Sequence, residues 1–202
     1  MSLMSYLALG DSYTIGECVP AAGRWPVQLA TTLRGEGVPL GEPTILATTG
    51  WTTDELSAAM DEARFAPPWD LVSLLIGVNN QYRGRDVEEY RGEFRRLLQR
   101  AIALAGARAG RVLVLSIPDW GVTPFAHDSG RDVARIASEL DAYNATAREE
   151  TLGLGACWVD ITPISRSHPA LLADDGLHPS AAQYTLWAEA TLSVARQALG
   201  SP

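Results

Sequence analysis

Short apolar runs alternate with longer segments of helical periodicity along the chain, and this alternation constrains the fold more than any other feature. The apolar runs have the length of strands and lie at Tyr6–Gly10, Thr44–Thr48, Leu71–Ile76, Arg111–Ile117 and Cys157–Ile161. Strands that alternate with helices usually pair in parallel and are covered on both faces, so the pattern predicts an α/β fold. With right-handed crossovers, we expect a flavodoxin-like, three-layer α/β/α domain around a five-stranded parallel sheet.

The segments between the apolar runs carry helix signals. Thr52 with Glu55, and Ser180 with Gln183, have the spacing of a capping box, in which two side chains satisfy the first backbone N–H groups of a helix. We expect the helices at Arg24–Arg34, Thr52–Glu62, Val87–Ala107, Asp132–Thr151 and Ser180–Leu199. The chain has 202 residues, the length of one typical domain, so we interpret residues 1–202 as a single domain.

The charges exclude several classes of function. The chain has 24 acidic and 16 basic residues and a formal net charge of −8, which argues against a nucleic-acid partner and against binding to an anionic membrane. Every basic residue is an arginine. The absence of lysine excludes P-loop nucleotide hydrolysis, Schiff-base chemistry, a Ser-Lys dyad and a receiver-type domain.

The two cysteines, Cys18 and Cys157, show neither a CxxC pair nor zinc-ligand spacing. We expect them to be free thiols, buried or half-buried, and we expect no metal and no other cofactor. Residues 1–5 lack the basic start of a signal peptide, and no apolar run reaches the length of a membrane helix. The expected location is therefore cytoplasmic, unless a leader has already been removed. The sequence does not predict the oligomeric state.

Polar residues follow the predicted strands, at the edge of the sheet where ligands bind in folds of this kind. Ser12 follows the first strand, and Asp175 and His178 lie in the loop before the last helix. A serine hydroxyl is a weak nucleophile until a base removes its proton, and an imidazole is a suitable base. Asp175 lies three residues before His178, close enough to orient the ring as the acid of a Ser-His-Asp triad does. Asp174 is an alternative partner by position.

Three groups at the same edge can stabilise an oxyanion. They are the backbone N–H of Ser12, the backbone N–H of Gly50 and the side-chain amide of Asn79. Each donor of this kind is typically worth a factor of about 10²–10³ in kcat. Nucleophile, base, orienting acid and oxyanion donors are therefore all expected beside one crevice.

Four blocks of the sequence resemble those of the GDSL/SGNH hydrolases. They are Gly10-Asp11-Ser12, Gly50 within TTGWTTDEL, Gly77-x-Asn79 and Asp175-x-x-His178, and they occur in the order of that family between Leu9 and Pro179. The resemblance implies an SGNH-type fold and a serine esterase or acylhydrolase. It further implies Ser12 as nucleophile, His178 as base, Asp175 as its partner, and Ser12, Gly50 and Asn79 as the oxyanion hole. No metal or cofactor is implied.

The sequence departs from the family pattern at Tyr13, where a leucine is usual, and at Asn80, where an aspartate is common. Both positions adjoin the expected pocket, so they bear on substrate preference. The aromatic residues that follow strands two to four are candidates either for lining that pocket or for packing in the core. They are Trp51, Tyr82, Trp120 and Phe125.

The expected function is the hydrolysis of a small-molecule carboxylic ester through an acyl-enzyme. A short acyl chain is favoured, because the chain leaves little room for a lid. Lysophospholipids, thioesters and acetylated sugars are alternative substrates for the same site. From another class, a carbohydrate- or lipid-binding module without catalysis remains an alternative, since a fold does not fix a function. A metal-dependent phosphohydrolase that uses Asp11 and Asp119 is a third hypothesis.

Overall fold

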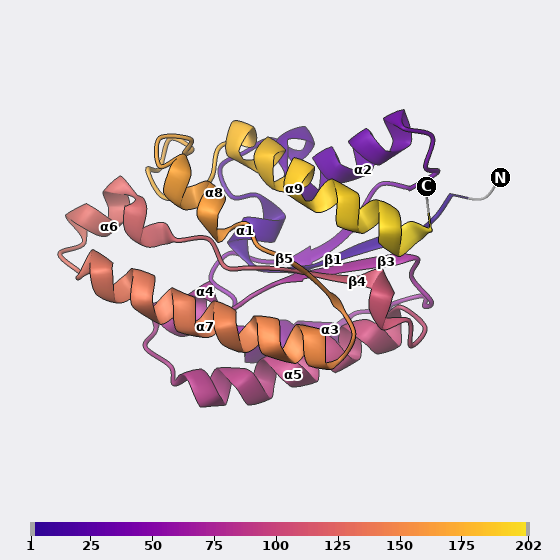
Figure 1. The fold of residues 1–202 in the computed structure, drawn as a ribbon, viewed down its shortest axis with the longest axis horizontal. Coiled ribbons are helices and arrows are strands. Elements are labelled where there is room, and N and C mark those ends of the chain that lie inside the picture. Colours follow the sequence, from indigo (N-terminus) through magenta and orange to yellow (C-terminus); the bar gives the residue numbers. More distant parts are fainter. Residues whose placement is uncertain (1–2, 201–202) are drawn as a thin grey trace.

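Five parallel strands form the centre of the molecule. In a computed structural model, which describes residues 3–200, they lie in the order β2-β1-β3-β4-β5. Figure 1 shows them between layers of helices. Their bounds are β1 Tyr6–Gly10, β2 Thr44–Ala47, β3 Leu71–Leu75, β4 Val112–Leu115 and β5 Cys157–Val159. This is the flavodoxin-like order, and the predicted fold class is confirmed. All carboxyl ends of the strands therefore meet at one edge of the sheet.

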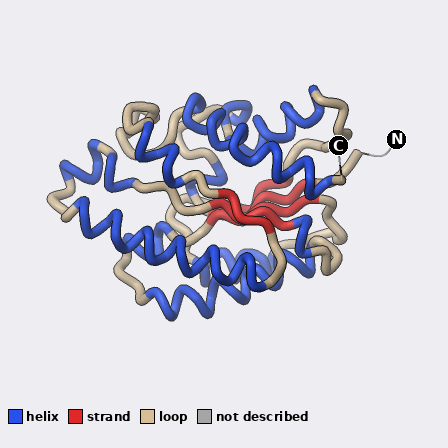
Figure 2. Tube along the Cα trace, viewed as in Figure 1, coloured by secondary structure: helices blue, strands red, loops and turns tan. Residues whose placement is uncertain are grey.

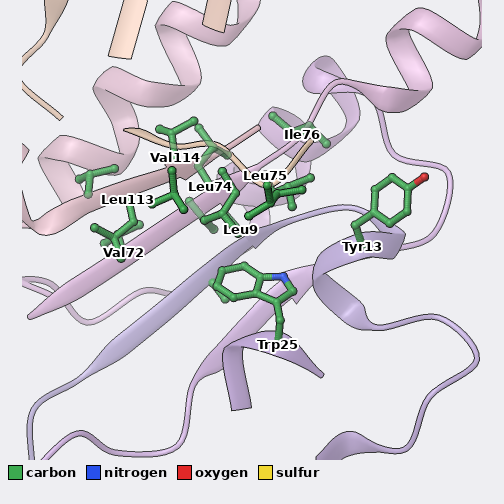
Figure 3. Close-up of a cluster of buried hydrophobic side chains, with 14 of the residues drawn as sticks. Leu9, Tyr13, Trp25, Val72, Leu74, Leu75, Ile76, Leu113 and Val114 are labelled. Atoms are coloured by element: carbon green, nitrogen blue, oxygen red, sulfur yellow. The ribbon is translucent and has the colours of Figure 1, made fainter. Parts of the chain in front are cut away.

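The three central strands are apolar because both of their faces are covered. Every residue of β1, β3 and β4 is buried, whereas the edge strands β2 and β5 are partly exposed. Leu9 pairs with Leu74, which in turn pairs with Val114 on β4. Figure 3 shows these side chains in one cluster, with Trp25 and Tyr13 beside it. The central strands thus form a rigid base for the loops at their ends.

Helices cover both faces of the sheet (Figure 2). One layer contains α2 and α9, which pack against each other, and the other contains α3, α5 and α7 (Figure 1). The bounds of these long helices are α2 Trp25–Gly35, α3 Thr53–Glu62, α5 Val87–Leu104, α7 Val133–Gly153 and α9 Ala181–Leu199. All five were expected from the sequence to within a few residues. The capping box of Thr52 and Glu55 is present, whereas Gln183 binds the carbonyls of His168 and Leu171 instead of closing the second box.

Four short helices were not predicted, because four to six residues are too few to establish a helical period. They are α1 Ser12–Ile15, α4 Val78–Tyr82, α6 Pro124–Asp128 and α8 Thr162–Ser167, and 3₁₀ turns lie at Ala21–Gly23, Ala109–Arg111 and Trp120–Val122. Helix α1 follows β1 directly, and α4 begins shortly after β3. These short elements are the ones that position the side chains at the carboxyl edge.

Strands β4 and β5 end earlier than the sequence suggested. Beyond β4, the backbone N–H of Ile117 donates to the Asn144 side chain at 2.7 Å. Beyond β5, the N–H of Ile161 donates to the Ser116 hydroxyl at 2.7 Å. Side chains therefore replace the strand-to-strand ladder at this edge, and the apolar pattern alone does not reveal the replacement.

No helix within residues 3–200 combines the length and the apolar character needed to cross a bilayer.

Candidate active site

A cavity of about 160 Å³ lies beyond the carboxyl ends of the strands. Its wall combines polar groups from the strand-end loops with apolar side chains from α4, α6 and the loop before α9. The lining residues are Ser12, Tyr13, Thr49, Gly50, Val78, Asn79, Tyr82, Trp120, Phe125, Leu177 and His178. Ser12, Gly50, Asn79 and His178, which come from four separate sequence blocks, therefore meet at one cavity.

Ser12 is the first residue of α1, and Asp11 caps that helix. The Asp11 carboxylate accepts a hydrogen bond from the backbone N–H of Tyr13 at 3.0 Å, which fixes the turn that carries Ser12. As the first helical residue, Ser12 has a backbone N–H without an intrahelical acceptor. Its hydroxyl makes no hydrogen bond within the described part of the chain. Both groups are thus free to interact with a molecule in the cavity.

Asp11 itself is a fully buried carboxyl group. Its second oxygen, Oδ2, has no hydrogen-bond partner among the described residues. Burial raises the pKa of Asp11 to about 7, against a smaller opposing contribution from its backbone hydrogen bonds. The residue beside the serine is therefore a structural cap with an unusually costly negative charge.

Asp175 and His178 form a hydrogen-bonded pair within one loop. The His178 Nδ1 and Asp175 Oδ2 atoms are 2.5 Å apart, and the side chains are 12% and 31% exposed, respectively. The other oxygen of Asp175 accepts the backbone N–H groups of Leu177 and His178, each at 3.0 Å. Burial opposes the ionisation of Asp175, but the His178 ring and these N–H groups outweigh it and hold the pKa of the carboxyl below its usual value. The pair thus joins an ionised carboxylate to the Nδ1 atom of an imidazole.

Aromatic packing supports the His178 ring. Tyr13 and the imidazole pack in an edge-type arrangement with centroids 5.8 Å apart, and Tyr13 also packs against Trp187 of α9 in this way at 6.0 Å. Tyr13 is only 3% exposed. It therefore acts more as a wedge between α1, α9 and the imidazole than as an open pocket surface.

Gly50 lies in a loop conformation that needs glycine. Its φ of 89° is in the left-handed region, and its backbone N–H has no acceptor among the described residues. The guanidinium of Arg83 donates to the Gly50 carbonyl oxygen at 2.7 Å and also pairs with Glu55 at 3.3 Å. Arg83 therefore clamps the peptide unit that follows the free N–H. The sequence alone gave no signal for this contact.

The Asn79 amide is held in a similar way. Its Nδ2 donates to the carbonyl oxygen of Trp51 at 2.9 Å, which orients the amide and leaves its second N–H available. Gly77 precedes α4 with a φ of 131°, and a Cβ atom there would lie 2.7 Å from the Tyr90 ring. A glycine is therefore required for the chain to turn from β3 into α4 and place Asn79.

Four of the six predicted pocket residues line the cavity and two do not. Tyr13, Tyr82, Trp120 and Phe125 are in its wall. Trp51 and Asn80 are absent from the wall, and Asn80 is fully buried. The Asn80 side chain binds both the N–H and the hydroxyl of Thr53, at 3.1 and 2.6 Å, so it fixes the start of α3 instead of meeting a ligand. Thr49, Val78 and Leu177 also line the cavity and were not predicted as pocket residues, although each lies inside a recognised block, next to Gly50, Asn79 and His178, respectively.

The aromatic wall is itself supported by polar contacts. Trp120 stacks at an angle against Tyr82 and Phe125, and its Nε1 donates to Gln81 at 2.9 Å. Arg131 lies over the Tyr82 ring, 4.0 Å from its centroid. Tyr82 and Phe125 are 39% and 37% exposed. They form a solvent-exposed part of the cavity wall.

The other two histidines, the alternative acid Asp174 and Arg85 are not in the cavity wall. His127 and His168 are exposed, and Asp174 is exposed without contacting His178. Arg85 pairs with Asp54 at 2.6 Å. The expectation for Cys18 was wrong, because this residue is exposed, whereas Cys157 is half-buried as expected.

Cys18 instead approaches the catalytic candidates. Its thiol donates to Asp175 Oδ2 at 3.5 Å. Partial desolvation and the negative charge of Asp175 raise the pKa of the thiol. The Cys18, Asp175 and His178 side chains are a group in the described chain whose donor atoms could bind a metal ion together.

Solved structures of similar fold cover nearly the whole chain. TesA matches with a TM-score of 0.72 and 18% identity over 97% of this chain and 100% of its own. An acetylxylan esterase, Axe2 from Geobacillus stearothermophilus, matches with a TM-score of 0.72 and 21% identity over 96% of each chain. The lipase/acylhydrolase from Enterococcus faecalis matches with a TM-score of 0.70 and 19% identity, over 98% of this chain and 96% of its own.

A sequence comparison with curated proteins gave no match. The model of the GDSL-like Lipase/Acylhydrolase family, in contrast, matches residues 8–186. This range contains all four sequence blocks and every residue that lines the cavity. The chain therefore belongs to the GDSL-like Lipase/Acylhydrolase family and is a hydrolase that acts on ester bonds.

Proposed function

We propose that this hydrolase cleaves carboxylic esters through an acyl-enzyme on Ser12, with His178 as base and Asp175 as its orienting acid. The observation that carries the proposal is the 2.5 Å contact between Asp175 Oδ2 and His178 Nδ1 on a residue that lines the same cavity as Ser12. The carboxylate keeps the proton on Nδ1, so Nε2 is left as the basic nitrogen.

In the first step, the Ser12 hydroxyl gives its proton to Nε2 of His178 while Oγ bonds to the ester carbonyl carbon. The carbonyl electron pair becomes an oxyanion, which the N–H groups of Ser12, Gly50 and Asn79 receive. When the carbonyl re-forms, the bond to the alcohol breaks and the alcohol takes the proton from Nε2. Water then repeats the sequence on the acyl-enzyme, releasing the carboxylic acid and restoring Ser12.

The size of the cavity supports a short acyl chain. A volume of about 160 Å³ is close to that of a cavity that holds one benzene molecule, roughly six heavy atoms. Acetyl to butyryl groups fit this volume, whereas a long chain would extend past Tyr82 and Phe125 into solvent. We therefore expect kcat/KM for p-nitrophenyl esters to be greatest for acyl groups of about two to four carbons, because groups of this size fit the cavity.

An acetylated carbohydrate is a second candidate substrate. Tyr82 and Phe125 are exposed at the cavity, and exposed aromatic faces can support an uncharged ring in the alcohol part of the ester. The fold is shared with an acetylxylan esterase, and the acyl group removed by that protein would fit here. Acetate release from acetylated xylo-oligosaccharide and from p-nitrophenyl acetate, measured side by side, distinguishes the two candidates.

The decisive experiment compares the wild-type protein with Ser12→Ala. We expect the wild type to hydrolyse p-nitrophenyl acetate and to be labelled by a fluorophosphonate, and the variant to show neither property. Full hydrolysis by Ser12→Ala would refute the assignment of the nucleophile. Ligand binding without turnover or labelling in the wild type would favour a binding module, and a maximum at twelve or more acyl carbons would refute the short-chain preference.

A further inference from the structure

Cys18 brings a thiol to the acid–base pair from a distant part of the chain. Its Sγ lies 3.5 Å from Asp175 Oδ2, the same oxygen that contacts Nδ1 of His178. The thiol, the carboxylate and the imidazole each offer one ligand atom, and these atoms all lie within 4.8 Å of one another. Cys18 and Asp175 are exposed, so an ion in solution can reach them.

The spacing of the donors fits a small tetrahedral site. Zinc binds sulfur at about 2.3 Å and nitrogen or oxygen at about 2.0 Å, which puts tetrahedral ligands roughly 3.3–3.5 Å apart. The contact between Cys18 and Asp175 already has this length. The contact between Asp175 and His178 has to open by somewhat less than about 1 Å, a small rotation for an exposed carboxylate.

The donor types and the local charge select the kind of ion. A thiolate with an imidazole prefers a borderline or soft cation such as Zn²⁺ or Cd²⁺ over Mg²⁺ or Ca²⁺. Glu17 and Asp174 add negative charge to that of Asp175 around Cys18. An incoming dication therefore meets an attractive potential at this position.

We propose that Cys18, Asp175 and His178 form an inhibitory site for a thiophilic divalent cation such as Zn²⁺. On binding, the thiol loses its proton to solvent and the sulfur bonds to the metal. Nδ1 of His178 also bonds to the metal, and its proton moves to Nε2, so the ring stays neutral. Cys18 has no part in ester cleavage, and the ion is not needed for it.

The consequence for catalysis rests on the proposed function. With the metal at Nδ1 and a proton on Nε2, the imidazole cannot accept the proton of Ser12. The enzyme is then inactive until a chelator removes the ion. Treatment with EDTA should therefore restore activity to a zinc-inhibited sample, the opposite of its effect on a metal-dependent hydrolase.

Direct binding of Cd²⁺ tests the site without relying on activity. A Cd²⁺ titration of Cys157→Ser, which retains Cys18, should produce the ultraviolet charge-transfer band of a cadmium thiolate, and Cys18→Ser should not. His178→Ala should weaken Cd²⁺ binding by at least the roughly 10- to 100-fold known for groups that merely support a ligand. No band in Cys157→Ser, or unchanged affinity in His178→Ala, would overturn the site whether or not the protein is an esterase.

Zinc inhibition is the second measurement. Wild type and Cys157→Ser should lose p-nitrophenyl acetate hydrolysis in ZnCl₂ and recover it in EDTA. Cys18→Ser should retain its basal activity and need at least about tenfold more zinc for half-inhibition. Equal sensitivity of Cys18→Ser and Cys157→Ser would refute the role of Cys18. A Cd²⁺ band at Cys18 in a protein without esterase activity would contradict the proposed function but support the metal site.

Discussion

Replacing Asp11 by asparagine should make the stability of the protein less sensitive to pH. Asp11 is fully buried, and one of its oxygens has no partner among the described residues. Burial raises its pKa from the usual 3.8 to about 7. Asparagine keeps the oxygen that caps α1 through the N–H of Tyr13 but has no charge to bury.

The magnitude follows from proton linkage. Below about pH 4, Asp11 is neutral in both the folded and the unfolded chain, so its titration costs nothing. Between pH 4 and 7 the unfolded chain ionises while the folded chain stays protonated, and the folded state progressively loses relative stability. Three pKa units correspond to about 4 kcal/mol, a loss that is complete above about pH 7. For a chain of this size it amounts to roughly 8–16 °C in Tm.

The assay is thermal or urea unfolding of wild type and Asp11→Asn from pH 4 to 8. Other titrating groups are common to both proteins, so the difference between the two curves isolates Asp11. We expect that difference to shift by about 4 kcal/mol in favour of the variant as the pH rises. Asp128→Asn, at an exposed position on α6, is the matched control for the change of residue type and should alter stability by no more than about 0.5 kcal/mol. A constant difference for Asp11→Asn would refute the argument, because it would mean that Asp11 is ionised throughout.

Three further predictions concern the cavity. Asn79→Ala should lower kcat for p-nitrophenyl acetate by about 10²–10³ with little change in KM, because one oxyanion donor is lost; a KM effect alone would contradict this. Arg83→Gln should lower kcat by up to about tenfold by releasing the Gly50 peptide, whereas Arg85→Gln, which does not contact Gly50, should not. Phe125→Trp should reduce the cavity and shift the butyrate-to-acetate ratio of kcat/KM toward acetate by about tenfold, and an unchanged ratio would remove Phe125 from the acyl pocket.

The long elements were predictable because their signals are local. An apolar run such as Leu71–Ile76 and the capping box at Thr52 are complete within a few residues of sequence. The order of the strands then follows from general rules of connection. The candidate nucleophile and base could be named for a related reason, since strand ends in such folds face one crevice.

The contacts that adjust the site were not predictable, because they join residues that are remote in sequence. Nothing near Arg83 indicates that it binds the carbonyl of Gly50, 33 residues away. Asn80 adjoins Asn79, yet it faces Thr53 and the inside of the protein. Cys18 has no neighbouring ligand motif, and only the fold brings it to Asp175. Composition and periodicity predict the helix or strand to which a residue belongs. They do not predict which distant residue its side chain will contact.

Asp175 and His178 lie three residues apart in one loop, and the Asp175 carboxylate also accepts a backbone N–H of that loop. Their mutual geometry is therefore a local property, largely independent of the sheet. The Ser12 hydroxyl, in contrast, is carried by α1, and Tyr13 of the same helix packs against both His178 and Trp187. Substitutions of Trp187 would therefore change how α1 presents the hydroxyl while leaving the contact between Asp175 and His178 in place, so the position of the alcohol and the orientation of the ring can be adjusted separately.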